Sequence, residues 1–367
     1  NVKSVVVPNT GNLKGIKAAA AAGIVAGDAD RVLEVISDVG PTVQDSIRQF
    51  LERTDMRVLK SDSPLTFNLL VRVFHKNLKA SVQVSHFHTN IVLVTKDDQL
   101  VYQNRDCDGT EIKSQTDRSF MNVKDILEFA QSVDIQAVKN ILERQINYNS
   151  KIAAEGMKST WGVNIGRLLM ETWNEDIKVR AKAMAAAGAD ARMSGCDLPV
   201  VIVSGSGNQG LTASIPVIEY ARAMNVEKEA LYRALLVSNL VTIHQKTGIG
   251  RLSAYCGAVS AGTGAGAGIS LLHGGGYRDI SHTIVNALAI LSGMICDGAK
   301  PSCAAKIAFA VEAGILGFDM YRNKKQFYDG EGIVKKGVEN TIASIGKLSR
   351  EGMRETDREI IRIMLEE

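Results

Sequence analysis

The stretch AVSAGTGAGAGISLL, residues 258–272, decides the fold class of this chain. Most of it is alanine, glycine and serine, and it carries no charge. It is shorter than the roughly 20 apolar residues that a membrane-spanning helix needs, so it is predicted to be a helix inside a protein core. The sequence around it, from Leu211 to Ala313, is nearly all helical in pattern. Because small side chains let helices approach closely, we expect tightly packed helices in the second half.

Composition excludes several classes of protein. The chain has 367 residues, 45% hydrophobic and 23% charged, which is ordinary for a globular protein of two domains. A net charge of +3 without a basic stripe argues against nucleic-acid binding. No signal peptide or membrane span is visible, and five cysteines without disulfide spacing favour a reducing cytoplasm. We expect a cytoplasmic homo-oligomer.

The pattern changes between residues 52 and 120, where short runs rich in β-branched residues alternate with charged turns. These runs are Met56–Leu59, Phe67–Phe74, Ser81–Val84, Asn90–Val94 and Leu100–Tyr102. The predicted fold is therefore α+β, a mainly helical core domain (1–51 and 121–367) with an inserted small antiparallel-sheet domain (52–120). The tail, 332–367, is predicted to be two amphipathic helices.

A glycine-rich motif, G-x-G-x-x-G at residues 205–210, follows an apolar segment and precedes a predicted helix that begins near Leu211. The motif matches a dinucleotide-binding fingerprint, but a second parallel strand should follow, and residues 217–243 are helical in pattern. A helix start with free backbone N–H groups also binds carboxylates, and a turn needed only for packing is the third interpretation. The substrate-binding candidates are Ser204, Gly205, Ser206, Gly207, Asn208, Gln209 and Gly210.

Three of the five cysteines, Cys256, Cys296 and Cys303, lie in segments of small residues that leave room for a bound group. Soft thiolates favour zinc or an iron–sulfur cluster, and no pair of ligands has the short spacing of a structural zinc site. Three buried core cysteines are the alternative. Cys107 and Cys196 are predicted to have no site role.

Seven segments together resemble the L-cysteine desulfidase family, which is related to the α chain of iron–sulfur L-serine dehydratases. They are VPNTG (7–11), HTNI (88–91), DARM (190–193), SGSGNQGLTA (204–213), RLSAYC (251–256), GMICDGAKPSCA (293–304) and ETD (355–357). The resemblance implies a [4Fe–4S] cluster with Cys256 and Cys296 as ligands, and Cys303 matches a further family cysteine. It also implies one more cysteine, in a Gly-Cys-Thr-Glu-Pro segment ahead of residue 1. This chain opens at Asn1 in an apparent strand, so we expect that segment, and an intact cluster, to be missing from the structure.

The activity that the resemblance implies is α,β-elimination, in which L-cysteine and water give pyruvate, ammonia and hydrogen sulfide. L-serine is the alternative substrate. The cluster would act as a Lewis acid. The base is open, with His88, Lys300 and Lys306 as candidates. Two other classes stay open: an NAD-dependent oxidoreductase, and a binding protein that keeps the pocket without the cluster.

Overall fold

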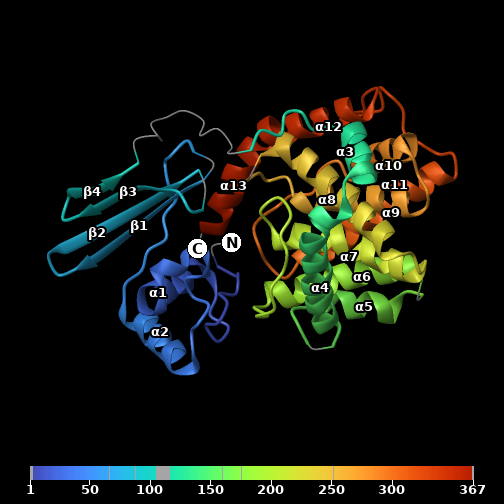
Figure 1. Cartoon of the computed structure of the whole chain (residues 1–367). Helices are drawn as coiled ribbons and strands as arrows, with labels where there is room; N and C mark the ends of the chain where they lie inside the picture. Colours follow the sequence, from blue (N-terminus) through green and yellow to red (C-terminus); the bar gives the residue numbers. More distant parts are fainter. Residues whose placement is uncertain are drawn as a thin grey trace.

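The computed structural model describes residues 3–365, except Thr66, Phe87, residues 105–115, Ser159, Glu175 and Arg251. Cys107 therefore lies outside the described residues, as does the first residue of the RLSAYC motif. The described chain confirms a mainly helical α+β fold with one small antiparallel sheet. Figure 1 shows the sheet together with α1 and α2 on one side of the molecule and the remaining helices, apart from α13, on the other.

The helical part is a bundle around one long hydrophobic core. Its helices are α3 (Val123–Ser132), α4 (Ile135–Lys158), α5 (Ile165–Thr172), α6 (Ile177–Met193), α7 (Gly207–Ala223), α8 (Lys228–Ile249), α9 (Gly257–Leu272), α10 (Tyr277–Ile290), α11 (Cys303–Arg322) and α12 (Val338–Lys347). A π-helical turn (Leu348–Gly352) joins α12 to α13 (Arg354–Leu365), which confirms the two predicted tail helices. No helix of the described residues is long and apolar enough to cross a membrane.

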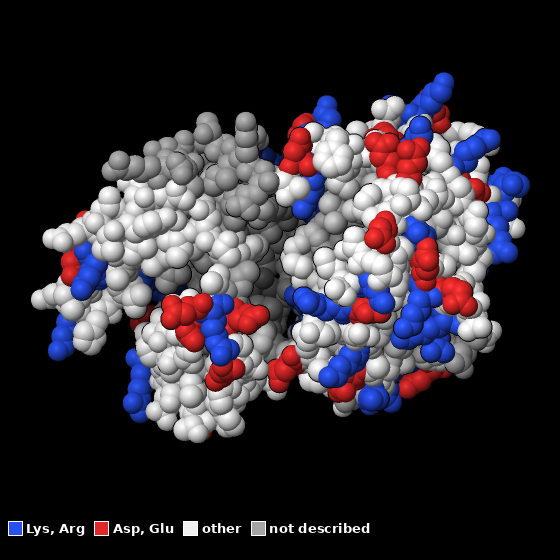
Figure 2. All heavy atoms as spheres, in the orientation of Figure 1, with Lys and Arg blue, Asp and Glu red and all other residues white. Residues whose placement is uncertain are grey.

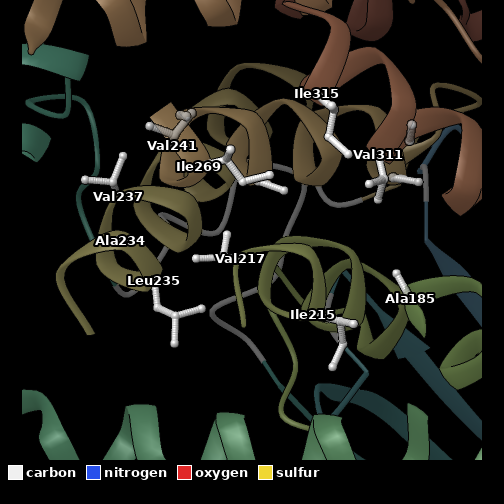
Figure 3. Packing of buried hydrophobic residues seen from close by; sticks show 14 of the residues in the cluster. Ala185, Ile215, Val217, Ala234, Leu235, Val237, Val241, Ile269, Val311 and Ile315 are labelled. Carbon is white, nitrogen blue, oxygen red and sulfur yellow. The ribbon is translucent and has the colours of Figure 1, made fainter. Parts of the chain in front are cut away.

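Helix α9 lies at the centre of the bundle, and its glycines explain why. A Cβ added to Gly262 would lie 2.1 Å from the backbone oxygen of Ala310 in α11, and one on Gly266 would lie 2.5 Å from that of Gly314. Gly264 and Gly268 approach α8 in the same way. The two glycines of each pair are four residues apart and therefore lie on one face of α9. The first face lets α11 approach closely and the second lets α8 approach closely. Figure 3 shows Ile269 of α9 beside the core residues of α7, α8 and α11.

Replacing Gly262 with alanine is expected to destabilise the protein by about 3 kcal/mol, because the added methyl group would overlap a backbone oxygen that cannot move independently. Gly23 is the matched control. It lies in α1 (Gly15–Ala26) with nothing within 4 Å of an added Cβ, so Gly23→Ala should stabilise by about 0.5–1 kcal/mol. Urea unfolding of the two variants checks the pair. Equal effects would contradict the packing argument.

The first residues and the sheet form the rest of the structure. Helices α1 and α2 (Pro41–Arg53), joined through a 3₁₀ segment (Ala29–Glu34), bury a hydrophobic cluster of their own around Ala18, Ala22 and Ile47. This cluster shares no residue with the main core. The division into a 1–51/121–367 domain and a 52–120 insertion stays a proposal.

The sheet is an antiparallel meander of β1 (Asn68–His75), β2 (Leu78–Ser85), β3 (Ile91–Lys96) and β4 (Gln99–Gln103). The hairpin predicted from Asn90 to Tyr102 is confirmed as β3 and β4. The strand predicted at Met56–Leu59 was wrong: this segment is irregular and pairs with none of the four strands, and Leu59 is 83% exposed, so it has no buried face to hold it against the sheet. The opening strand was also wrong, since Val6 makes only a single bridge, to Lys14.

Candidate functional site

Two short extended segments bring Cys256 and Cys296 together. Tyr255 and Ile295 form an isolated antiparallel bridge. The backbone N–H of Cys256 donates to Met294 O at 2.8 Å, and that of Cys296 donates to Ala254 O at 2.6 Å. The two thiols are hydrogen-bonded to each other. The prediction that these cysteines share one place in the fold is confirmed.

The hydrogen bond between the two thiols favours the thiolate form of Cys296 over that of Cys256. The hydrogen bond from Cys256 lowers the pKa of Cys296 to about 6, against the effect of burial and with help from the Gly298 backbone, Lys306 and Lys300. The same hydrogen bond, together with burial, raises the pKa of Cys256. Cys296 is therefore the thiol prepared to act as an anionic ligand.

Cys303, the first residue of α11, faces the same place. Its Sγ lies 3.8 Å from Gly298 O, and it lies close enough to Cys256 and Arg192 to affect the pKa of each. The three cysteines predicted as ligands thus surround one region.

Two lysines beside the thiols are held by one carboxylate. Lys306 Nζ donates to Asp297 Oδ1 at 2.7 Å and to Ile295 O at 2.6 Å, and Lys300 Nζ also donates to Asp297. Burial raises the pKa of Asp297, but the two lysines outweigh it and hold that pKa at about 2. Burial lowers the pKa of Lys306, but the carboxylate of Asp297 has the larger effect, so the pKa of Lys306 is raised. Asp297 thus holds both ammonium groups beside the thiols.

A third lysine, Lys246 of α8, was not predicted. It is 8% exposed, and Cys296 and Cys256 lie close enough to affect its pKa. Burial lowers its pKa, and the two thiols oppose that effect. Within the described residues its ammonium group makes no ion pair. Lys246 thus balances negative charge at the thiols, and nothing in its sequence context indicates this burial.

The glycine-rich turn lies at the N-terminus of α7, which begins at Gly207 and not near Leu211. The earlier start arises because Ser206 caps the helix, its Oγ accepting from Gln209 N at 3.4 Å. The side chain of Gln209 packs against Gly257, where an added Cβ would lie 2.4 Å from its Nε2. The N-termini of α7 and α9 therefore meet beside Cys256.

Arg192, near the end of α6, is the residue that sequence reasoning missed at this junction. Its Nη1 donates to Asn208 Oδ1 at 3.2 Å, and a Cβ on Gly207 would lie 2.4 Å from its Nε. Burial lowers its pKa, and Cys303 opposes this. No carboxylate pairs with this guanidinium in the part of the chain that the structure describes. Arg192 is part of the DARM motif, but nothing in the sequence predicted a role for it.

Two polar atoms of the turn are buried without a hydrogen-bond partner among the described residues, Gln209 Oε1 and Ser204 Oγ. Buried polar atoms are nearly always bonded, so unpaired ones indicate a place for a bound polar group. Together with the guanidinium of Arg192 and the free N–H groups of α7, they form a polar region beside the thiols.

His88 is not brought to the cysteines by any described contact. It is exposed in the turn after β2, and its ring packs on Phe67 with centroids 4.7 Å apart. Its catalytic role stays a prediction.

The cysteines supply the soft donors that an iron–sulfur cluster takes. No group of three or more cysteine, histidine or acidic side chains among the described residues is arranged to hold one metal ion. In an iron–sulfur cluster each thiolate binds its own iron, and the cluster with its thiolates is anionic. The cationic side chains near the three thiols are Lys246, Lys300, Lys306 and Arg192.

Asp190 anchors the segment that carries Arg192. It is fully buried; its Oδ2 accepts from Gly166 N at 3.4 Å, and its Oδ1 has no partner among the described residues. Burial raises its pKa to about 6, against the backbone hydrogen bonds. Because this pKa is above the unfolded value of 3.8, the stabilising contribution is complete below pH 3.8 and is lost as the pH rises through 6.

Asp190→Asn should therefore be more stable than the parent at pH 8, by about 3 kcal/mol for two pKa units, with the difference shrinking toward pH 4. Urea unfolding of both proteins between pH 4 and pH 8 measures this. A difference that is constant with pH would show that Asp190 does not titrate in this range.

Comparison with known proteins places the chain in a family. The family model described as the serine dehydratase alpha chain matches residues 18–362, so the chain belongs to that family. The chain is 57% identical over 365 residues to a UPF0597 protein of Desulfitobacterium hafniense, covering 100% of this chain and 85% of that protein. It is 48% identical over 367 residues to a UPF0597 protein of Lachnoclostridium phytofermentans, with 100% and 87% covered. These matches support the serine dehydratase-like relationship, and the narrower desulfidase assignment rests on the motifs alone.

Proposed function

We propose that this protein is a lyase that catalyses α,β-elimination from a small L-amino acid, with L-cysteine as the substrate and pyruvate, ammonia and hydrogen sulfide as products. One observation carries the proposal: the half-buried guanidinium of Arg192, without a carboxylate partner among the described residues, lies at the N-terminus of α7 near Cys303. The family description, serine dehydratase alpha chain, supports an elimination of this kind.

The substrate carboxylate would bind to Arg192 and to the N–H groups at the start of α7. A guanidinium matches a carboxylate in geometry and charge, and a helix N-terminus adds favourable partial charge. Asn208 would hold Arg192 in place, because its Oδ1 accepts from Nη1. This arrangement would hold the substrate beside the thiols, because the N-terminus of α7 meets that of α9 next to Cys256.

Cys256, Cys296 and Cys303 would hold a [4Fe–4S] cluster, which when bound supplies a Lewis acid for the leaving sulfur. Lys246, Lys300 and Lys306 would balance the charge of the thiolates. In the elimination a base removes the Cα proton, the Cβ–S bond breaks, and the leaving sulfur is protonated to hydrogen sulfide. The resulting aminoacrylate tautomerises to an imine, and water hydrolyses it to pyruvate and ammonia.

The base stays open among His88, Lys300 and Lys306. Both lysines donate to Asp297, so either would have to leave that carboxylate and lose a proton before it could take the Cα proton, and His88 would have to leave Phe67. L-serine is the second candidate substrate, favoured by the family description, and the same residues would bind its carboxylate.

The test is turnover by the full-length protein after anaerobic reconstitution with iron and sulfide. Pyruvate is measured with L-cysteine and with L-serine, and iron is counted in the same sample. Pyruvate formation from L-cysteine supports the proposal, and formation from L-serine alone selects the second candidate. Amino-acid binding without turnover by a fully loaded protein would favour a binding protein instead.

A further inference from the structure

A second polar cavity lies at the opposite end of α9 from Cys256. Its volume is about 130 Å³, and it opens where α9 ends, α10 begins and α11 ends. The residues that line it are Ser270, His273, Gly275, Asp279, Thr283, Phe318, Tyr321 and Arg322. Ser270 is 14 residues along the chain from Cys256, which is about 21 Å along a helix. The cavity is therefore separate from the cysteine site.

Two opposite charges line this cavity without pairing with each other. Arg322 lies near the ring of Phe318, 5.9 Å from its centroid, and Asp279 Oδ2 accepts from Gly276 N at 3.0 Å. Within the described residues neither side chain makes an ion pair. The guanidinium of Arg322 and the carboxylate of Asp279 share this small cavity but do not pair. A ligand that carries both a negative and a positive charge can therefore bridge them.

The cavity wall also contains an unpaired buried hydroxyl. Ser270 is 1% exposed, and its Oγ has no hydrogen-bond partner among the described residues. It lies against Gly275, where an added Cβ would be 2.4 Å from that Oγ. The hydroxyl stays at the cavity because residue 275 has no side chain, and an unpaired buried hydroxyl is costly unless a ligand or water bonds to it.

Size limits the ligand. A volume of about 130 Å³ corresponds to about four water molecules. His273 closes one side, its Nδ1 3.0 Å from Ile269 O and its ring 4.8 Å from that of Phe318. A compact molecule of five to seven non-hydrogen atoms fits, and a large side chain does not.

We propose that this cavity binds a small zwitterionic α-amino acid, in the range from glycine to serine. The carboxylate pairs with Arg322, the ammonium group pairs with Asp279, and Ser270 Oγ supplies a further hydrogen bond. The contacts are independent of the cysteines and do not require the protein to be a lyase.

The probe is glycine, which has no β-substituent to eliminate, titrated into the purified protein by calorimetry. Arg322→Gln and Asp279→Asn are each expected to weaken this binding at least tenfold, and asparagine keeps an oxygen to cap α10. Arg278→Gln removes a neighbouring exposed charge that does not line the cavity and should leave binding unchanged. Acetate and methylamine, with one charge each, should bind at least tenfold more weakly than glycine.

Glycine can also bind at the cysteine site, and Arg192→Gln separates the two. The proposal requires one binding event that survives Arg192→Gln and is lost in Arg322→Gln. It is overturned if the parent protein binds no glycine, if every event survives Arg322→Gln, or if acetate binds as tightly as glycine. The last result would assign the cavity to simple anions.

Discussion

Cys296→Ser is expected to abolish both cluster uptake and pyruvate formation while leaving the fold intact. Cys256 and nearby lysines lower the pKa of Cys296 to about 6, which favours its thiolate form. A serine hydroxyl at the same place stays protonated near neutral pH and is a poor ligand for iron. Iron content and visible absorbance after anaerobic reconstitution measure uptake, and circular dichroism measures the fold.

Cys196→Ser is the matched control. Cys196 is half-buried against the main core, and burial raises its pKa. Serine there should cost some stability and leave the iron content unchanged. Equal loss of iron in both variants would point to general destabilisation. Full iron content in Cys296→Ser would remove Cys296 from the ligand set.

The fold was predictable where a local pattern and a tertiary contact agree. The four-residue spacing of Gly262 and Gly266 belongs to a helix face, and that face packs on α11. The strand prediction at Met56–Leu59 was wrong because β-propensity is local, whereas a strand needs a partner edge, and this segment pairs with none of the four strands. Surface charge offered little guidance, since Figure 2 shows both signs interspersed over the helical part.

The site was predictable only in its cysteines. Cys256 and Cys296 are 40 residues apart, and the bridge between Tyr255 and Ile295 that joins them has no sequence pattern. The partners of these thiols come from distant helices. Lys246 is buried because of the way α8 packs, and a helical lysine is exposed by default. Lys300 and Lys306 were candidates from the sequence, whereas Lys246 and Arg192 could be found only from the assembled structure.

The same assembly shows how the region can hold negative charge. Asp297 takes up Lys300 and Lys306, whereas Lys246 and Arg192 have no carboxylate partner among the described residues. Positive charge in excess of carboxylates, in a buried region with a paired thiolate, favours binding of anionic groups. A cluster held by thiolates is anionic, and so is a substrate carboxylate. The same excess of positive charge therefore favours the binding of both proposed groups.

Arg192→Gln should lower kcat/KM by about 100-fold or more, because breaking a buried charged contact costs about 2–5 kcal/mol. Glutamine keeps a hydrogen-bonding group near Asn208 but has no charge for the substrate carboxylate. Asn208→Ala should have a smaller effect, about tenfold, and mainly on KM, since it removes only the acceptor that orients Arg192. Steady-state kinetics on reconstituted protein, normalised to iron content, measure both variants against Arg278→Gln as the exposed control.

Arg192 also lies near Cys303, so its charge has a competing role in cluster binding. The two roles separate by iron content: a carboxylate-binding role leaves the cluster in place and raises KM, whereas loss of iron in Arg192→Gln would make Arg192 a support for the cysteines and overturn its assignment to the substrate.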